Sequence, residues 1–265
     1  DLFQQEMVAR ERLEIEVHLA RQIQETFIPE ALPACTGWDL SARWRTARQV
    51  GGDFYDIFEL PDKRIGIFIA DVADKGMPAA LFMALTRTLV HAAVLQTDTP
   101  SAALNQVNDL LYPDCRQGMF VTAVYGVLDT VTGQFTYANA GHNPPLWVHK
   151  SDLPASGEQP KVAVERLVRT GIALGVIEHA GMTERSVQLT PGDMLYFYTD
   201  GVTEAFSPDG DIYGEQRLLQ LLMDSQAETA EDMLDEIDAG VNHFIADCPM
   251  SDDMTMIAVK MTGQP

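Results

Sequence analysis

The amino-acid sequence predicts an α+β fold, in which two packed antiparallel β-sheets are flanked by helix pairs (an αββα sandwich) and preceded by an N-terminal helix. Strand-like apolar runs dominate the chain after residue 38, and short polar turns such as "DTVTG" and "TPGD" favour antiparallel neighbours. The helical patterns come in two pairs set between batches of strands. Such pairs do not give the regular alternation of strand and helix that a doubly wound parallel sheet requires.

Residues 1–28 predict one helix, because they contain no Gly or Pro and end directly before Pro29. Leu13, Ala20 and Phe27 recur every seven residues, and the apolar residues Val17 and Ile23 lie beside them. The pattern covers about two heptads, fewer than a coiled coil usually needs. Two interpretations therefore stay open: a short coiled coil that forms a homodimer through this helix, or an amphipathic helix packed on its own domain. We expect residues 1–30 to be separate from a globular domain over 31–265.

After this helix, apolar runs rich in β-branched and aromatic residues predict the strands. In chain order they cover 64–72, 119–129, 133–141, 144–150, 185–190, 193–200 and 254–261. Longer segments with helical apolar spacing predict helices over 77–96, 100–112, 214–226 and 230–247. The segment 150–164, "KSDLPASGEQPKVAV", is rich in turn-forming residues and is expected to be a loop.

The composition fits one large globular domain, or one domain with an appendage, because 46% of the 265 residues are hydrophobic. The 18 Lys and Arg residues against 39 Asp and Glu residues give a formal charge of -21. Such a surface repels nucleic acid and anionic membranes, and it fits a basic substrate or bound cations instead. No run of about 18 uncharged apolar residues occurs, so no membrane-spanning segment is expected.

The three cysteines, Cys35, Cys115 and Cys248, are far apart and form no C-x-x-C pair. They are expected to be reduced, buried thiols, which predicts a cytoplasmic protein without disulfides or a zinc site. The chain opens on Asp1 without an initiating Met, so we expect it to be a piece of a longer protein.

Four apolar strands carry an aspartate at one end, next to Gly or to another acidic residue. These residues are Asp53, Asp71, Asp200 and the pair Asp252–Asp253. Each alone could be a turn former, but together they are harder to explain, because a carboxylate near a core is costly unless charge offsets it. A divalent cation supplies that charge, and oxygen-only ligands favour Mg²⁺ or Mn²⁺ over zinc.

Such a set of carboxylates suits two octahedral ions that share a bridging aspartate. Two ions of this kind lower the pKa of a bridging water and orient it for in-line attack on phosphorus. Gly51 and Gly52 lie beside Asp53, and Gly201 lies beside Asp200. Because glycine has no Cβ, these positions let the backbone approach the ions closely and offer a carbonyl ligand.

Two further residues have competing interpretations. Arg48 is the cation nearest in sequence to Asp53, so it either binds phosphate or is a solvated surface residue. His142 in "AGHNPP" is either a general acid or a hydrogen-bonding residue that fixes the turn before Pro144, and we expect the second role. Neither a G-x-S-x-G nor a C-x5-R nucleophile motif occurs, so direct hydrolysis by water is expected.

Seven motifs occur in the order of a known family: "VGGDFYD", "DVADKGMPAAL", "MFVTAVYGVLD", "YANAGHNPPL", "ALGV", "LTPGDMLYFYTDGVTEA" and "SDDMTMIAV". Together they resemble the SpoIIE/RsbU branch of the metal-dependent serine/threonine protein phosphatases (PPM, the protein phosphatase type 2C superfamily), over residues 38–261. The resemblance implies the αββα sandwich of that superfamily. The segment "EIEVHLARQIQETFIPEALP" is similar to the linker helix that precedes this domain in sensor-coupled members.

The resemblance also implies roles for single residues. The metal-binding and catalytic aspartates of the family fall on Asp53, Asp71, Asp200 and the Asp252–Asp253 pair. Asp71 is implied to bridge two Mn²⁺ or Mg²⁺ ions, and the backbone carbonyl of Val72 is a further candidate ligand. Within the pair, we expect Asp252 to be the ligand and Asp253 to support it. Asp56 is expected to be structural.

The function that the resemblance implies is a Mn²⁺- or Mg²⁺-dependent serine/threonine phosphoprotein phosphatase in a bacterial partner-switching (stress-response) pathway. The implied substrate is a phosphorylated anti-anti-sigma factor of the STAS type. The helix over 1–28 would pass a signal from an upstream sensor region, through which the whole protein could be attached to a membrane. The alternative is a catalytically silent phosphoprotein-binding module, disfavoured because every acidic position is filled. A metal-dependent nuclease is disfavoured by the charge of -21.

Overall fold

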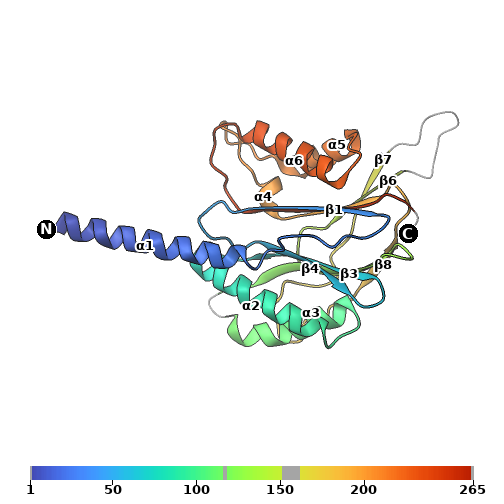
Figure 1. The fold of residues 1–265 in the computed structure, drawn as a ribbon, viewed down its shortest axis with the longest axis horizontal. Helices are drawn as coiled ribbons and strands as arrows, with labels where there is room; N and C mark the ends of the chain where they lie inside the picture. Colours follow the sequence, from blue (N-terminus) through green and yellow to red (C-terminus); the bar gives the residue numbers. More distant parts are fainter. Residues whose placement is uncertain (1, 116–117, 151–161, 264–265) are drawn as a thin grey trace.

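Two five-stranded antiparallel sheets pack face to face in the computed structural model, which describes residues 2–115, 118–150 and 162–263 (Figure 1). Sheet A has the strand order β1 (Trp38–Arg45), β10 (Met254–Met261), β9 (Met194–Tyr198), β6 (Leu146–Lys150) and β7 (Val162–Arg166). Sheet B has the strand order β2 (Phe54–Leu60), β3 (Arg64–Val72), β4 (Val121–Asp129), β5 (Gln134–Ala140) and β8 (Arg185–Gln188).

The layer between the two sheets is filled by alternate residues of their strands. Ile65, Ile67 and Ile69 of β3 lie in this layer together with Phe197 of β9. Phe68, which lies between two of these isoleucines, belongs instead to the core beneath the helices that cover sheet B. Both faces of β3 are therefore buried, which explains why its sequence is a continuous apolar run rather than an alternating one.

Helix pairs cover the outer faces of both sheets (Figure 1). The four helices are α2 (Met77–Val94) and α3 (Pro100–Leu111) on sheet B, and α5 (Gly214–Asp224) and α6 (Ala230–Ile245) on sheet A. A capping box between Thr229 and Asp232 begins α6, where it satisfies two N–H groups that have no partner within the helix. Two short elements are η1 (Tyr112–Asp114) and α4 (Asp200–Thr203). The predicted αββα sandwich is confirmed.

Among the described residues, α2 is the one helix that is long and apolar enough to cross a membrane by length and composition. Its buried residues include Ala79, Met83 and Val90, which pack in the core between sheet B and the helices that cover it. The apolar character of α2 is therefore that of a helix with one face in a protein core.

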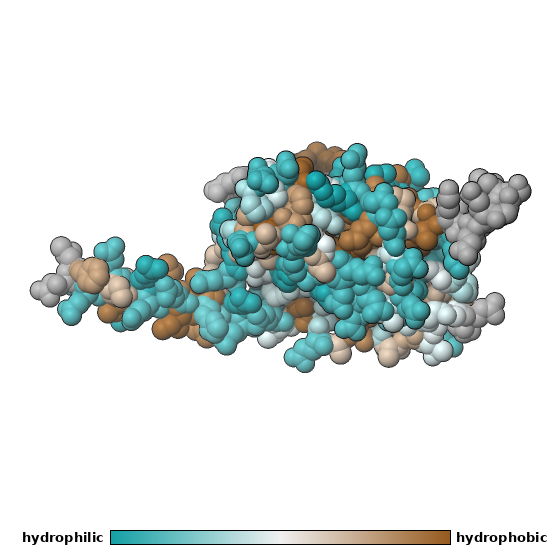
Figure 2. Space-filling view, turned by 90° about the horizontal axis from the view of Figure 1, so that it is seen from above, coloured by the Kyte–Doolittle hydropathy of each residue, from teal (hydrophilic) through white to brown (hydrophobic). Residues whose placement is uncertain are grey.

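Helix α1 (Leu2–Glu25) extends away from the two sheets and their covering helices (Figure 1). Most of its described side chains are exposed, and Figure 2 shows apolar groups on its surface; Leu13, for example, is 61% exposed. Val17 and Ala20 are half-buried, and Gln24 is the one buried residue among those described in this helix. Packing of α1 on its own domain is therefore confined to the C-terminal end of the helix.

Four elements, β1, β7, η1 and α4, were not predicted from the sequence. β1 and β7 are the edge strands of sheet A, and most of their residues are half-buried or exposed. An edge strand of this kind has no strong apolar pattern to reveal it. β7 begins at Val162, so the expected loop over 150–164 was wrong for its last three residues, and residues 151–161 lie outside the described part of the chain.

Candidate metal centre

Asp53 and Asp71 lie side by side at one end of sheet B. Asp53 directly precedes β2, and Asp71 is the penultimate residue of β3. Because Phe54 pairs with Ala70 in antiparallel register, Asp53 and Asp71 are the next residues at that end. The hydroxyl of Thr255, on β10 of sheet A, donates a hydrogen bond to Asp53 Oδ2 at 3.2 Å. This end of sheet B therefore contacts sheet A directly.

The other acidic residues lie at the facing end of sheet A. Asp200 begins α4 directly after β9, and Asp252–Asp253 directly precede β10. The Thr199 N–H donates to the Thr255 carbonyl at 3.0 Å, and the Thr255 N–H donates to the Thr199 hydroxyl at 3.0 Å. These bonds bring the start of α4 beside the start of β10. The fold thus gathers acidic residues from four separate segments of the chain.

Asp253 holds the segment that leads into Asp53. Its Oδ1 accepts a hydrogen bond from the Ala47 N–H, and its Oδ2 accepts one from the Gly52 N–H, both at 2.8 Å. Both carboxylate oxygens are thereby engaged with backbone N–H groups, and the side chain is buried. This arrangement suits a residue that supports the site rather than one that binds an ion.

The glycines of the site lie where a side chain has no room. A Cβ on Gly51 would overlap the Asp253 carboxylate, and a Cβ on Gly201 would overlap the backbone carbonyl of Asp253. A Cβ on Gly52 would lie 3.0 Å from the carbonyl oxygen of Val72, which therefore faces the glycine segment. These glycines are needed for close approach of backbone segments at the acidic cluster.

Gly201→Ala is expected to lower the free energy of unfolding in EDTA by about 1–3 kcal/mol, because overpacking against a backbone atom forces β10 and α4 apart. The intrinsic preference of alanine over glycine in a helix, roughly 0.5–1 kcal/mol, acts in the opposite direction and is smaller. Urea unfolding measures the change, with Gly263→Ala as control because nothing lies within 4 Å of a Cβ there. Equal stability of the two variants would contradict this account of Gly201.

The carboxylates perturb one another strongly. Burial, followed by the charges of Asp71 and Asp253, raises the pKa of Asp53 well above its usual value. Burial raises the pKa of Asp71 to about 6, although a hydrogen bond with Asp53 acts in the opposite direction. Burial and then the charges of Asp71, Glu204 and Asp252 raise the pKa of Asp200 to about 7. Such mutual shifts arise only between carboxylates that share a confined space.

The donor set fits a hard divalent cation. Asp53, Asp71, Asp200 and Asp252 supply carboxylate oxygens, the Val72 carbonyl adds a backbone oxygen, and the glycines leave room beside them. In the geometry of the described residues, however, no group of three or more His, Cys, Asp or Glu side chains is placed so that it could hold a metal ion. The Asp252 carboxylate is paired with a lysine.

The structure adds Lys75 to the cluster, and this residue was not predicted from the sequence. Its Nζ donates to Asp252 Oδ2 at 2.5 Å and to the Ser251 carbonyl at 3.1 Å. The hydrogen bond that Lys75 donates to Asp252 is the main cause that raises the pKa of Lys75, and the nearby charge of Arg48 acts in the opposite direction. Arg48 itself is exposed. The position of Lys75 within "DVADKG", four residues after Asp71, was the signal that could have identified it.

His142 and Asp56 lie outside the acidic cluster. His142 is buried, its Nδ1 lies 2.8 Å from the Thr122 hydroxyl, and its backbone N–H donates to Asn139 Oδ1 at 2.9 Å. Burial lowers the pKa of His142 to about 3, so it is neutral and suits the turn-fixing role rather than that of a general acid. Asp56 is buried and pairs with Arg87 and His91 of α2, as a structural carboxylate would.

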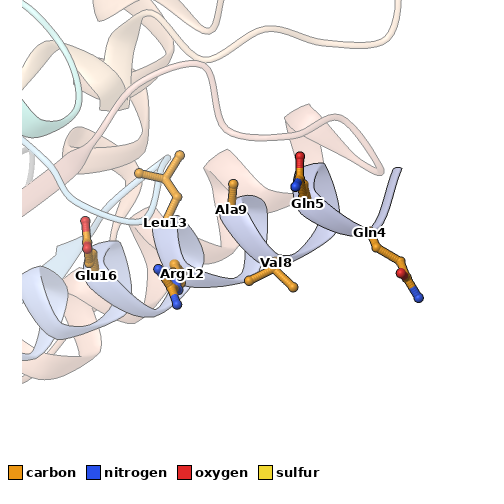
Figure 3. A pocket seen from close by; sticks show the side chains of 7 residues that line it. All are labelled: Gln4, Gln5, Val8, Ala9, Arg12, Leu13 and Glu16. Atoms are coloured by element: carbon orange, nitrogen blue, oxygen red, sulfur yellow. The ribbon is translucent and has the colours of Figure 1, made fainter. Parts of the chain in front are cut away.

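One surface hollow lies away from this cluster, on the N-terminal helix. It is lined by seven residues of α1 alone, and the side chains point in several directions around the helix (Figure 3). A hollow formed by one exposed helix has no converging polar groups from other elements, which a catalytic site requires. We therefore do not consider it a candidate active site.

Comparisons with known proteins identify the family and the fold of this chain. The sequence family described as Stage II sporulation protein E (SpoIIE) matches residues 61–262. Protein IcfG of Synechocystis is 34% identical, with 92% of this chain and 41% of IcfG covered. Phosphoserine phosphatase RsbU of Bacillus subtilis is 27% identical, with 95% of this chain and 71% of RsbU covered. The chain thus spans about two fifths of the length of IcfG.

Solved structures share the fold. The SiaA-PP2C domain of Pseudomonas aeruginosa matches with a TM-score of 0.80 and 23% identity, covering 95% of this chain and 98% of that domain. The catalytic domain of the serine/threonine protein phosphatase PstP, in complex with two manganese ions, matches with a TM-score of 0.54 and 14% identity, covering 84% of this chain and 97% of that domain. The family match covers most of the chain and includes Asp71, Asp200 and Asp252. This chain belongs to the SpoIIE family, whose fold is that of the type 2C protein phosphatases.

Proposed function

We propose that this chain is a Mn²⁺- or Mg²⁺-dependent serine/threonine phosphoprotein phosphatase. The observation that carries the proposal is the convergence of acidic residues from four chain segments at facing ends of two sheets, in a member of the SpoIIE family. A turn-forming role for each aspartate would not raise the pKa of Asp71 and of Asp200 through burial and mutual charge.

In this proposal, Asp53, Asp71, Asp200 and Asp252 hold two divalent ions, with Asp71 as the bridging ligand and the Val72 carbonyl as a further ligand. The ions would supply charge stabilisation for the transferring phosphoryl group and an activated water. Asp253 keeps the segment before Asp53 in place through its two backbone hydrogen bonds.

Lys75 and Arg48 are the cations that would meet the phosphate in this proposal. Lys75 pairs with Asp252, so an ion held by Asp252 would compete with the Lys75 ammonium for this carboxylate. The released ammonium would then lie beside the ions, where a phosphate oxygen needs a donor. Arg48 lies close enough for its charge to affect Lys75, and it is exposed to an incoming substrate.

We further propose that residues 1–30 are a linker helix and residues 31–265 the phosphatase domain. The name of RsbU, a phosphoserine phosphatase, supports a phosphoserine substrate. We propose that the substrate is a phosphorylated STAS-type anti-anti-sigma factor, within a cytoplasmic partner-switching pathway. An upstream sensor region would act through α1, and two copies would associate along it. The whole protein's activity and partners belong to this proposal, because relatives such as IcfG are much longer than this chain.

The proposal is tested by dephosphorylation of candidate phosphorylated STAS proteins in Mn²⁺, in Mg²⁺ and in excess EDTA. We expect hydrolysis with either ion and none in EDTA. Full activity in EDTA would overturn the metal-dependent mechanism. Binding of the phosphoprotein without any hydrolysis, in the presence of bound Mn²⁺, would support the catalytically silent binding module instead.

A further inference from the structure

One side chain of α1 reaches the acidic cluster. Gln24 is 3% exposed, whereas most of the other described residues of this helix are exposed. Its Nε2 donates a hydrogen bond to the Gly51 carbonyl at 2.6 Å, and its Oε1 accepts one from the Gly51 N–H at 3.1 Å. A single amide thus satisfies both polar backbone groups of Gly51, which lies 27 residues further along the chain.

Gly51 belongs to a segment in which each residue is held by a different side chain. Gln24 holds Gly51, Asp253 accepts from the Gly52 N–H at 2.8 Å, and the Trp44 indole donates to the Asp53 carbonyl at 2.8 Å. The ladder of sheet B begins only at Phe54, so sheet pairing does not fix these three residues. Their positions, and so the direction of the Asp53 side chain, depend on these contacts.

The space around Gly51 leaves little freedom. On one side a Cβ would overlap the Asp253 carboxylate, so the backbone here is already in close contact with that side chain. On the other side Gln24 holds both backbone groups. A shift of Gln24 therefore moves Gly51 either away from Asp253 or against it. Because Asp53 lies only two residues further along the chain, such a shift also changes the position of Asp53.

The end of α1 is itself anchored. Phe27 packs against the core beneath sheet B, and the guanidinium of Arg87 on α2 lies 5.8 Å from the centre of its ring. Arg87 also forms an ion pair with the buried Asp56, with 3.0 Å between Nη2 and Oδ2. Because most of the other described residues of α1 are exposed, this anchor and Gln24 fix the C-terminal end of the helix against the domain.

We propose that Gln24 is a positioning residue for the divalent-cation site: it holds Gly51 so that Asp53 stays beside Asp71. The inference rests on the proposed function only in taking Asp53 and Asp71 as cation ligands. It assigns Gln24 no contact with the ions or the substrate.

The test measures Mn²⁺ affinity directly, by calorimetric titration of the full chain and by the Mn²⁺-induced rise in melting temperature. Gln24→Ala removes both hydrogen bonds, and Gln24→Met removes them while keeping most of the side-chain volume. The control is Gln22→Ala, the same change at an exposed position of the same helix. We expect both Gln24 variants to bind Mn²⁺ about tenfold more weakly, and the control to bind as the wild type does.

Saturating Mn²⁺ should restore most of kcat in Gln24→Met, because the residue positions a ligand and does not take part in the reaction. Wild-type Mn²⁺ affinity in both Gln24 variants would overturn the proposal, whatever happens to activity. If the Gln24→Ala protein melts far below the wild type in EDTA, the Mn²⁺ affinity of the Gln24→Met variant decides whether the proposal holds. Normal Mn²⁺ binding by the wild type without hydrolysis would overturn the proposed function and leave this inference standing.

Discussion

Asp71→Asn is expected to abolish Mn²⁺-dependent hydrolysis of a phosphoserine protein, with kcat/KM reduced by roughly a hundredfold to a thousandfold or more. Asp71 lies beside Asp53, and its carboxyl is sensitive to the charges of Asp252 and Asp253 as well. An asparagine keeps the shape of the side chain but removes the charge on which two neighbouring cations would depend. The measurement is the release of phosphate from the substrate at several Mn²⁺ concentrations.

The matched control for this variant is Asp74→Asn. Asp74 lies in the bend that follows β3, three residues after Asp71, and it is exposed. Its backbone φ of 112° is positive, and asparagine is among the residues that adopt positive φ more often than most. We expect Asp74→Asn to keep most of the activity. Undiminished activity of Asp71→Asn would show that Asp71 does not hold the catalytic ions, and the assignment of the site would have to be abandoned.

Asp200→Asn is expected to raise the melting temperature of the protein in EDTA by a few degrees and to remove most of the stabilisation by Mn²⁺. Without metal, like charges at close range repel by roughly one to a few kcal/mol at an effective dielectric near 20. A change of about 1 kcal/mol shifts the melting temperature of a domain of this size by roughly 2–4 °C. Mn²⁺ stabilises only a protein that binds it, so the loss of a ligand reduces that shift.

The same variant has an expected pH signature in EDTA. The folded-state pKa values of Asp71, about 6, and Asp200, about 7, lie above the ordinary aspartate value. The folded protein therefore binds these protons more tightly than the unfolded chain does, and the stability they give is lost as pH rises from about 4 to about 7. The melting temperature of the wild type should fall over this range, and more steeply than that of Asp200→Asn.

Differential scanning fluorimetry in EDTA and in Mn²⁺, at several pH values, measures both effects. Asp209→Asn, at an exposed turn after α4, serves as a control that should behave as the wild type does. An Asp200→Asn protein that melts lower than the wild type in EDTA, yet gains as much from Mn²⁺, would contradict the placement of Asp200 among the ligands. The Asp71→Asn variant should also melt at a higher temperature than the wild type in EDTA and gain less from Mn²⁺.

Much of the fold could be predicted from the sequence because the central strands are buried, and burial restricts them to apolar residues. The continuous apolar runs over 64–72 and 254–261 became β3 and β10, whose residues are buried almost throughout. The edge strands β1 and β7 escaped prediction because half-burial leaves polar and charged residues within them. A helix or strand can be predicted from the sequence to the extent that burial restricts its residues to apolar types.

The candidate site divides in the same way. Sequence alone determined which aspartates end apolar strands, which glycines lie beside them, and that their motifs resemble one family. Only the tertiary structure decided that Asp253 holds backbone N–H groups, that Lys75 pairs with Asp252, and that Gln24 holds Gly51. The physical reason is distance along the chain: these partners lie from 27 to 206 residues apart. Hydrogen bonds between such residues depend on how two sheets and a helix pack, and no local pattern of residues records that packing.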